Sequence, residues 1–414
     1  MGVRAAHRLV ALVAALAFAL AAAGPAGAAG RPPDLTAQAA ILVEASTGDV
    51  LYQRAADKRR PIASATKLMT ALLTMEHTEL ADEVVASSYV ASPIESKLGL
   101  RPGERLSVAD LLRGLMLESA NDAAVTLAEH VSGSRAAFVR LMNSRARELD
   151  LRNTHFDNPI GFDGAGNFSS ARDLARLALA LREHDFVRKV ANRTAATLTT
   201  GYRPRTIRNR NTLLARDPAV NGLKTGHTTS AGYVLVGTRT RSRVTLVSIV
   251  LGTPSTTARD QDSLALLQWG DGLYRQIVPV TGGTVVARPE IEFRRGASVP
   301  LVTARSVRRT VRADAKITTR DVGVPETVTG PIGRNQRLAH REVLADGKPI
   351  ARVPIVSRYF VPEADLTQRT KDWFTRVPSL ILAVAVLGGT VLVARRLRRG
   401  PPRRRPPRSE PEAA

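Results

Sequence analysis

Residues 61–73 read PIASATKLMTALL, and the rest of the chain is organised around this stretch. The pattern predicts a short apolar helix that opens behind Pro61. Ser64 and Lys67 stand three residues apart, so a helix puts their side chains on one face, within reach of each other. The amine of Lys67 can then take the hydroxyl proton of Ser64. The stretch therefore predicts the nucleophile helix of an acyl-transferring serine enzyme.

The surroundings of this pair are apolar. The leucines and the methionine at positions 68, 69, 72 and 73 would bury the helix. Burial at low dielectric lowers the pKa of a lysine, so that its neutral amine can act as a base. A Ser-x-x-Lys turn also occurs by chance about once in a chain of this length, mostly on solvated helix surfaces. The prediction therefore depends on the motifs that accompany the turn.

Length and composition restrict the class of protein. The chain has 414 residues, 44% of them hydrophobic, which is enough for two domains. Its net charge of +23 suits an anionic polymer as partner, such as nucleic acid, a membrane surface or cell-wall material. The absence of cysteine excludes thiol nucleophiles, disulfides and thiolate metal sites. No His-Glu-x-x-His spacing occurs and no Gly-x-Ser-x-Gly surrounds Ser64, so we expect no metal and no cofactor.

Residues 1–28 have the features of a secretory signal peptide. Arg4 and Arg8 precede an uncharged apolar run over residues 9–23, and small residues follow at 26–28. We expect cleavage before Ala29 and export of the rest of the chain; an uncleaved N-terminal anchor is the alternative. Export argues against nucleic acid as the partner.

A second apolar segment, residues 377–394, contains no charged residue. Two aromatic residues precede it and arginines follow it at once. These flanks predict a single transmembrane helix with residues 29–376 outside the cell membrane. Residues 395–414 hold eight arginines against two glutamates, interspersed with prolines. This composition predicts a basic cytoplasmic tail held near acidic lipid heads.

Residues 29–278 alternate between strand patterns and helix patterns. The predicted elements are a strand hairpin over 40–53, helices over 107–117, 138–149 and 170–181, apolar strands at 233–238 and 244–251, and a helix over 260–269. This order predicts an α/β domain whose sheet is assembled from both ends of the domain and covered by helices.

Residues 279–361 show strand patterns alone. Asp346-Gly347 separates two of the apolar runs and is a strong hairpin signal. We expect a small all-β, sandwich-like domain here, followed by a polar stalk over residues 362–376.

Two further polar clusters accompany the Ser-x-x-Lys turn. Ser119-Ala120-Asn121 falls between two predicted helices, so its side chains sit on a turn and can project into a cleft. Lys224-Thr225-Gly226 falls on a predicted edge strand, where the lysine and the hydroxyl can hold a carboxylate and the glycine lets a substrate backbone approach. In this order on helix, turn and strand, the three motifs are the signature set of penicillin-recognising serine enzymes.

With these motifs the chain resembles the D-alanyl-D-alanine carboxypeptidases, the low-molecular-mass penicillin-binding proteins. The matching stretches are residues 61–73, 115–124, 153–156, 169–173 and 224–228. The likeness covers residues 39–278 closely and the all-β domain loosely. It implies an antiparallel sheet flanked by helices, with a helical subdomain. It also implies removal of the terminal D-alanine from peptidoglycan stem pentapeptides through an acyl-enzyme, acylation by β-lactams, and a catalytic domain facing the cell wall.

The resemblance implies a catalytic role for the first two motifs. Ser64 matches the acylated serine and Lys67 matches its general base. Ser119 matches the second hydroxyl, which relays the proton, and Asn121 matches its polar partner.

The third motif matches the substrate-binding strand of that family. The backbone N–H groups of Ser64 and His227 would form the oxyanion hole. Arg259 aligns with an arginine that the family uses near the terminal carboxylate, and Arg210 is a second candidate. An ordinary surface position is the alternative for both arginines. The side chain of His227 as an acid or base is a further alternative.

Three functions stay open on this basis. The first is a membrane-tethered D,D-carboxypeptidase that trims wall precursors, and the second is a D,D-endopeptidase or β-lactamase of the same fold. The Glu-x-x-Leu-Asn that supplies the deacylation glutamate in class A lactamases is missing between the second and third motifs. The third is a catalytically silent, wall-binding scaffold. The intact residues of all three motifs argue against it.

Overall fold

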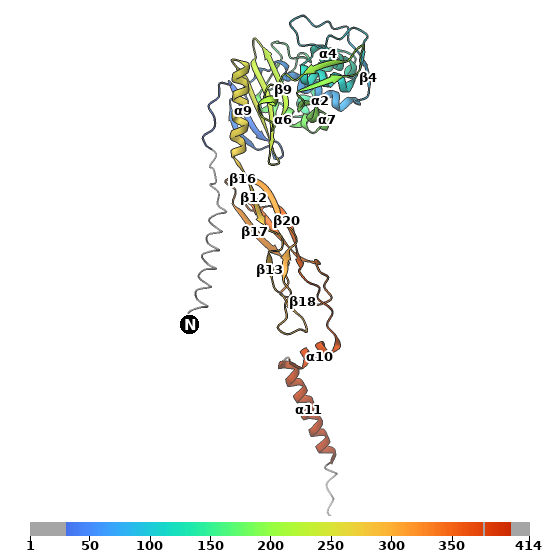
Figure 1. The fold of residues 1–414 in the computed structure, drawn as a ribbon, viewed down its shortest axis with the longest axis vertical. Helices are drawn as coiled ribbons and strands as arrows, with labels where there is room; N and C mark the ends of the chain where they lie inside the picture. The colour runs from blue at the N-terminus through green and yellow to red at the C-terminus, as the bar shows by residue number, and fades with distance from the viewer. Residues whose placement is uncertain (1–29, 376, 399–414) are drawn as a thin grey trace, which may run out of the picture. The chain divides into compact units, whose positions relative to one another are not determined.

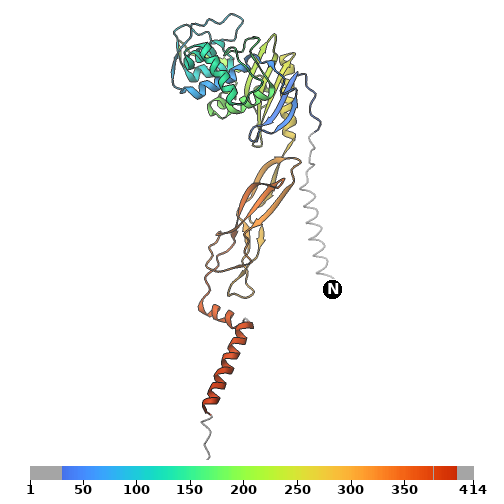
Figure 2. The same cartoon turned by 180° about the vertical axis from the view of Figure 1, so that it is seen from behind.

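The computed structural model describes residues 30–375 and 377–398 (Figures 1 and 2). The predicted signal peptide and most of the predicted basic tail lie outside the described residues. The chain divides into two compact units. The first runs to Gln276 and takes in Thr310–Asp314, and the second comprises Ile277–Arg309 and the chain from Ala315 onward.

The first unit is built on an antiparallel five-stranded sheet with strand order β2-β1-β11-β10-β9. Its strands are β1 (Ala39–Glu44), β2 (Val50–Arg54), β9 (Val220–Thr228), β10 (Gly232–Arg241) and β11 (Val244–Thr253). Because β1 pairs with β11, both ends of the unit contribute to the sheet, as the sequence predicted. Strand β9, which carries the Lys-Thr-Gly motif, lies at the edge.

Alternation along β1 divides its side chains between two cores. Ile41 and Val43 face a core that they share with the helical block. Leu42 faces a second core, formed with helix α9 (Thr256–Gly272), which runs along the other face of the sheet (Figure 1). At Gly270 of α9 a Cβ atom would lie 2.6 Å from a methyl carbon of Leu42, so glycine permits this close packing.

A helical block covers the face opposite α9. Its helices are α2 (Lys67–His77), α3 (Val108–Arg113), α4 (Asn121–Ser132), α5 (Arg135–Glu148), α6 (Ala171–Arg182) and α7 (Asp185–Ala191), with a 3-10 turn η1 (Ala63–Thr66) and a π-helical turn η2 (Gly114–Glu118). The short helix α8 (Leu213–Arg216) instead packs into the core of α9 through Leu213. The short strands β3 (Arg60–Pro61), β4 (Glu83–Val85), β5 (Arg105–Ser107), β6 (Phe168–Ser169), β7 (Ala195–Leu198) and β8 (Arg205–Arg208) pair in twos around it.

One expectation about the central stretch was wrong in detail. Residues 61–73 do not form a single helix, because Pro61 pairs with Phe168 in the β3–β6 ribbon. Ser64 therefore lies on η1, and the α-helix begins only at Lys67. The four apolar side chains at 68, 69, 72 and 73 are buried, as expected.

The second unit contains a five-stranded sheet with strand order β13-β15-β20-β19-β17. Its strands are β13 (Val285–Ala287), β15 (Leu301–Thr303), β17 (Ile317–Val322), β19 (Arg337–Ala345) and β20 (Lys348–Ser357), and the unit also contains β14 (Glu290–Ile291) and β18 (Thr327–Val328). Strands β12 (Tyr274–Val280) and β16 (Val307–Arg312) pair with each other, and each has residues in both units. Asp346 and Gly347 join β19 to β20 with φ angles of 49° and 78°, the positive values that a tight hairpin turn requires. The predicted hairpin and the predicted C-terminal sheet domain are thus confirmed.

Two helices follow this sheet. Helix α10 (Leu366–Thr375) lies within the predicted stalk, and α11 (Val377–Arg398) contains the predicted transmembrane segment. Within the described residues, α11 is the one helix that is long and apolar enough to cross a membrane.

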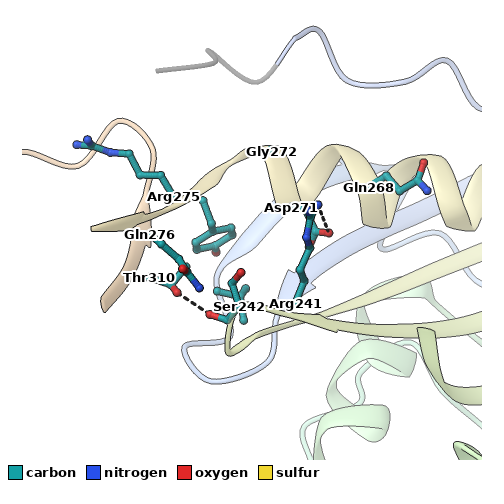
Figure 3. A pocket seen from close by; sticks show the side chains of 10 residues that line it. Arg241, Ser242, Gln268, Asp271, Gly272, Arg275, Gln276 and Thr310 are labelled. Carbon is teal, nitrogen blue, oxygen red and sulfur yellow. Dashed lines mark hydrogen bonds and ion pairs between the residues drawn. The ribbon is translucent and has the colours of Figure 1, made fainter. Parts of the chain in front are cut away.

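A cavity of about 400 Å³ lies at the C-terminal end of α9 in the first unit (Figure 3). Arg241 and Ser242 from the β10–β11 turn line it together with Asp271 and Thr310. Thr310 Oγ1 donates a hydrogen bond to the carbonyl oxygen of Ser242 at 2.5 Å. All of the predicted site residues lie elsewhere.

Candidate active site

The nucleophile turn brings Ser64 and Lys67 together. Lys67 Nζ lies 3.1 Å from Ser64 Oγ, and it also donates a hydrogen bond to the carbonyl oxygen of Ile160 at 2.5 Å. The Lys67 side chain is fully buried. Burial holds the pKa of this amine well below its usual value, and the nearby charge of Lys224 lowers that pKa further, while Glu95 opposes the shift. An amine in this state can accept a proton from Ser64.

The second motif follows the π-helical turn η2. Ser119 adopts a left-handed backbone conformation with φ = 62°, which ends the turn and directs the chain into α4. Its Oγ accepts a hydrogen bond from Lys224 Nζ at 2.9 Å. A hydroxyl from one motif is thereby joined to the lysine of another, across 105 positions of the sequence.

Asn121, the third residue of this motif, opens helix α4. Its side-chain amide donates to Glu95 Oε2 at 2.7 Å, and its backbone N–H donates to the carbonyl oxygen of Ser96 at 2.8 Å. Asn121 therefore fixes the loop that carries Glu95 and Ser96. We had expected it as the polar partner of Ser119, and Glu95, its partner in the structure, was missed from the sequence.

The third motif lies on edge strand β9 with Lys224 almost fully buried. Burial lowers the pKa of Lys224 to about 7, and the charges of Arg210 and Arg259 lower it as well. At Gly226 a Cβ atom would lie 3.0 Å from the backbone nitrogen of Ser64. Glycine thus lets the strand approach the nucleophile turn.

His227 follows the motif and is exposed. Its ring stacks on Tyr233 of the neighbouring strand, with the ring centroids 4.0 Å apart and 28° between the planes. Stacking gives the imidazole a packing contact, and its backbone N–H stays the candidate for the oxyanion hole.

The two candidate arginines approach from different elements. Arg259, on α9, is buried and donates through Nε and Nη2 to Asp260 Oδ1 at 2.9 and 2.8 Å. Arg210 is half exposed and pairs with Glu118 at 2.6 Å. Each carboxylate fixes the guanidinium that it contacts.

A single cleft of about 460 Å³ brings these groups together, a size typical of small-molecule sites. Its lining residues are Ser64, Ile94, Ser96, Ser119, Arg210, Thr225, Gly226, His227, Tyr233, Thr256 and Arg259. The predicted lysines and Asn121 stand behind this lining and contact it. The three motifs therefore meet at one place, which is what the proposed chemistry requires.

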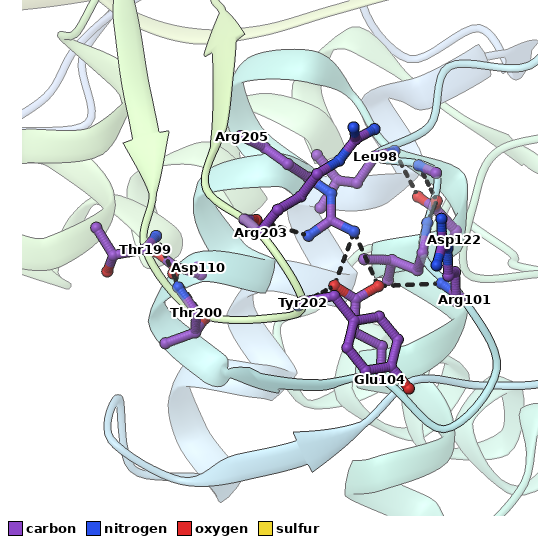
Figure 4. Close-up of polar contacts among 12 residues, drawn as sticks. Leu98, Arg101, Glu104, Asp110, Asp122, Thr199, Thr200, Tyr202, Arg203 and Arg205 are labelled. Carbon is purple, nitrogen blue, oxygen red and sulfur yellow. Dashed lines mark hydrogen bonds and ion pairs between the residues drawn. The ribbon is translucent and has the colours of Figure 1, made fainter.

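Buried carboxylates hold several loops of the first unit, and sequence reasoning missed them (Figure 4). Asp122 accepts hydrogen bonds from the backbone N–H groups of residues 98, 99 and 100 at 2.9 to 3.0 Å. Asp110 accepts from the backbone N–H groups of residues 199 and 200, and Glu104 accepts from that of Tyr202 and from Arg205. The partners of these carboxylates lie about 20 to 100 positions away in the sequence. No local sequence pattern therefore predicts these contacts.

The loop that supplies the Ile160 carbonyl was also missed. It begins with Asn158-Pro159, a pair that marks turns, but a backbone acceptor leaves no side-chain signature in the sequence. Across the described residues, no group of three or more histidine, aspartate or glutamate side chains is placed to hold a metal ion.

Comparison with known proteins places this geometry in a family. The family model described as D-alanyl-D-alanine carboxypeptidase, peptidase S11, matches residues 26–255. D-alanyl-D-alanine carboxypeptidase DacF of Bacillus subtilis is 30% identical over 353 residues, which are 81% of this chain and 90% of that protein. D-alanyl-D-alanine carboxypeptidase DacA of Escherichia coli is 32% identical over 357 residues, which are 82% of this chain and 87% of that protein.

Solved structures show the same similarity. Penicillin binding protein 5 from Haemophilus influenzae is 31% identical, with a TM-score of 0.57 over 80% of this chain and 99% of that one. The Streptomyces K15 DD-transpeptidase is 33% identical, with a TM-score of 0.55 over 58% of this chain and 98% of that one.

Proposed function

Because the chain belongs to the D-alanyl-D-alanine carboxypeptidase family, we propose that it removes the terminal D-alanine from peptidoglycan stem pentapeptides by acylation of Ser64. By family it is a serine hydrolase of the penicillin-binding fold. The observation that carries the proposal is the meeting of two serine–lysine pairs at one cleft, Ser64 with Lys67 and Ser119 with Lys224.

Acylation begins when Ser64 Oγ attacks the carbonyl carbon between the two D-alanines. Lys67 Nζ, 3.1 Å away and with its pKa lowered by burial, takes the hydroxyl proton. The backbone N–H groups of Ser64 and His227 stabilise the oxyanion. Ser119 relays the proton taken up by Lys67 to the nitrogen of the departing D-alanine, which leaves as the free amino acid. Water then hydrolyses the ester, which releases the shortened peptide as a carboxylic acid and restores the hydroxyl of Ser64.

The substrate carboxylate occupies the strand side of the cleft. Lys224, Thr225 and Arg259 supply a cation, a hydroxyl and a guanidinium there, and Arg210 adds a second guanidinium at the rim. A β-lactam presents a carboxylate and a reactive carbonyl in the same relation, so it acylates Ser64 as well. We therefore propose peptidoglycan stem peptides and β-lactams as the ligands of this cleft.

The activity is tested with a D-Ala-D-Ala peptide and a cross-linked muropeptide, using the detergent-solubilised full chain. We expect free D-alanine from the peptide and no cleavage of the cross-link. A Ser64→Ala variant should release none. Cleavage of the cross-link would favour the endopeptidase alternative, and release that continues in Ser64→Ala would contradict the proposal.

We further propose that residues 29–278 form the catalytic domain and residues 279–361 a spacer or docking domain. In this proposal the helix over residues 377–394 anchors both outside the cell membrane. The apolar helix α11 and the arginines at its C-terminal end support this topology. A chain that ends before residue 377 should be released from the membrane fraction, whereas the full chain should resist alkaline extraction. Retention of the truncated chain would contradict the anchor.

A further inference from the structure

A short loop, residues 158–163, lies against the nucleophile turn and forms no part of the three motifs. We refer to it as the carbonyl loop. Two of its backbone carbonyls are tied to helix α2: Ile160 accepts from Lys67 Nζ at 2.5 Å and Pro159 accepts from Thr70 Oγ1 at 2.7 Å. The loop is therefore fixed to the helix that carries the base.

Asn158 organises this loop from within. Its Oδ1 accepts hydrogen bonds from the backbone N–H groups of Ile160, Gly161 and Phe162 at 3.2, 2.7 and 3.1 Å. Three donors on one oxygen fix the peptide planes on both sides of Ile160, so the direction of the Ile160 carbonyl depends on Asn158.

The loop is also pressed against the nucleophile. Gly161 has φ = 92°, and a Cβ atom there would lie 2.1 Å from the carbonyl oxygen of Ala63 and 3.0 Å from the nitrogen of Ser64. At its far end Asp163 Oδ1 accepts from Thr228 Oγ1 at 2.6 Å, just past the Lys-Thr-Gly motif. The carbonyl loop thus bridges the two walls of the cleft.

The hydrogen-bonding capacity of the amine explains why this matters. A neutral amine has two N–H bonds and one lone pair. When one N–H is bound by the Ile160 carbonyl, rotation of the amine is restricted, and its lone pair can be held toward Ser64 Oγ at 3.1 Å. Without that acceptor the amine can rotate, and fewer of its orientations can take the proton.

We propose that Asn158 is a positioning residue for acylation: by fixing the Ile160 carbonyl, it orients the Lys67 amine toward Ser64. The inference rests on the proposed function. It assigns a task to a side chain that does not line the cleft. Burial is the largest cause of the lowered pKa of Lys67, and the carbonyl loop supplies part of that burial.

The test measures penicillin acylation of the solubilised full chain against pH, with non-covalent affinity and acylation rate determined separately. In Asn158→Ala the acylation rate should fall about 10- to 100-fold while the affinity stays the same. Water admitted by the loosened loop should raise the pKa of Lys67 toward its usual value. Since the neutral amine is the active form, the acid limb of the rate profile should move to higher pH.

Asn143→Ala is the matched control. Asn143 holds Phe156, two residues before Asn158, by donating to its carbonyl oxygen at 2.8 Å and accepting from its N–H at 3.0 Å. This variant should lower thermal stability to a similar degree and leave the acylation rate and its acid limb in place. Thr70→Val removes only the hydrogen bond to Pro159. It should lower the acylation rate and move the acid limb to higher pH, as Asn158→Ala does, but by a smaller amount. This variant replaces Asn158→Ala in the test if Asn158→Ala does not fold.

The outcomes separate this inference from the proposed function. A wild-type chain that is not acylated by penicillin overturns both. A wild-type chain that is acylated supports the proposed function, and the inference then fails if Asn158→Ala and Thr70→Val keep the wild-type rate and acid limb. It also fails if Asn143→Ala shifts the acid limb as much as Asn158→Ala.

Discussion

The two walls of the cleft each carry a buried lysine bonded to a serine hydroxyl, yet the surroundings of the two lysines differ. On the helix wall, Lys67 donates to the carbonyl oxygen of Ile160 on a separate loop, and burial and the charge of Lys224 hold its pKa well below the usual value while Glu95 opposes this shift. On the strand wall, Lys224 donates to the carbonyl oxygen of the next residue, Thr225, at 2.9 Å, and burial together with the charges of Arg210 and Arg259 lowers its pKa to about 7.

This difference separates the roles of two chemically identical side chains. Two neighbouring arginines lower the pKa of a lysine, and a bound anion raises it again. Such a lysine is therefore suited to binding a substrate carboxylate. A desolvated lysine whose amine is oriented by a separate loop and whose pKa is held well below the usual value suits proton abstraction. Neighbours from distant parts of the chain, rather than the motif itself, decide which lysine does which.

The largest difference between the two lysines is expected when each is exchanged for arginine and the acylation rate is measured. Arginine keeps the positive charge but does not give up its proton in a protein, so it cannot serve as a base. Lys67→Arg should lower the acylation rate about 10²- to 10⁴-fold, the usual contribution of a general base. Lys224→Arg should keep more of that rate, because a cation for the carboxylate remains. Thermal melting of both variants controls for misfolding, and equal losses of acylation in two folded variants would contradict the division of roles.

Removal of the arginines should weaken substrate binding on the strand wall. Arg259→Gln should raise KM about 10- to 100-fold with little change in kcat, the effect of losing one charge-assisted hydrogen bond. Arg210→Gln should raise KM less, because Arg210 is half exposed and already paired with Glu118. The kinetics of D-alanine release measure both constants. An unchanged KM in Arg259→Gln would remove this residue from the carboxylate site.

The pH dependence of KM should report the protonation state of Lys224, the lysine of the strand wall. Its pKa is about 7 in the free enzyme, so the amine loses its charge as the pH rises above 7. A bound carboxylate favours the charged amine, and substrate binding must then take up a proton. KM should therefore rise above pH 7, toward about tenfold per pH unit.

The same measurement can be sharpened with an arginine variant. Because the charge of Arg259 lowers the pKa of Lys224, Arg259→Gln should move the onset of the rise in KM to higher pH. A KM that stays constant from pH 6 to 9 in the wild-type chain would show that the Lys224 ammonium does not bind the carboxylate.

The smallest effect is expected in the second unit, which contributes no residue to the cleft lining. Glu342 accepts from Arg320 at 2.6 Å and from Arg352 at 2.8 Å, and these contacts lower its pKa to about 2. A carboxyl group whose pKa is lowered by folding stabilises the fold fully at pH values above its usual pKa. This stabilisation is lost as the pH falls through the lowered pKa of about 2. Glu342→Gln should leave D-alanine release unchanged and lower the melting temperature slightly at neutral pH. A loss of turnover would tie the sheet domain to catalysis.

Patterns local in the sequence predicted much of the fold. The hairpin at Asp346-Gly347 and the helices that begin after Ser107 and Ser170, each capped by its serine hydroxyl, all depend on residues within a few positions of each other. Strands β10 and β11 were predicted from their apolar runs, and the three motifs were identified from residue type and spacing.

What the sequence did not predict depends on contacts between distant segments. Pro61 leaves the helix because it pairs with Phe168, more than a hundred residues away. The acceptor for Lys67 is a backbone carbonyl 93 residues away, and a carbonyl is present at every position. Likewise, Glu95 has the same local context whether or not Asn121 meets it. Such partners become visible only once the segments are packed.

The central claim, that the cleft acylates Ser64, is tested most directly by mapping the adduct of a labelled penicillin on the full chain by mass spectrometry. The account predicts one adduct, on the peptide that contains Ser64, and no adduct in a folded Ser64→Ala variant. A label on another residue, a label that persists in Ser64→Ala, or no label on the wild-type chain would contradict it.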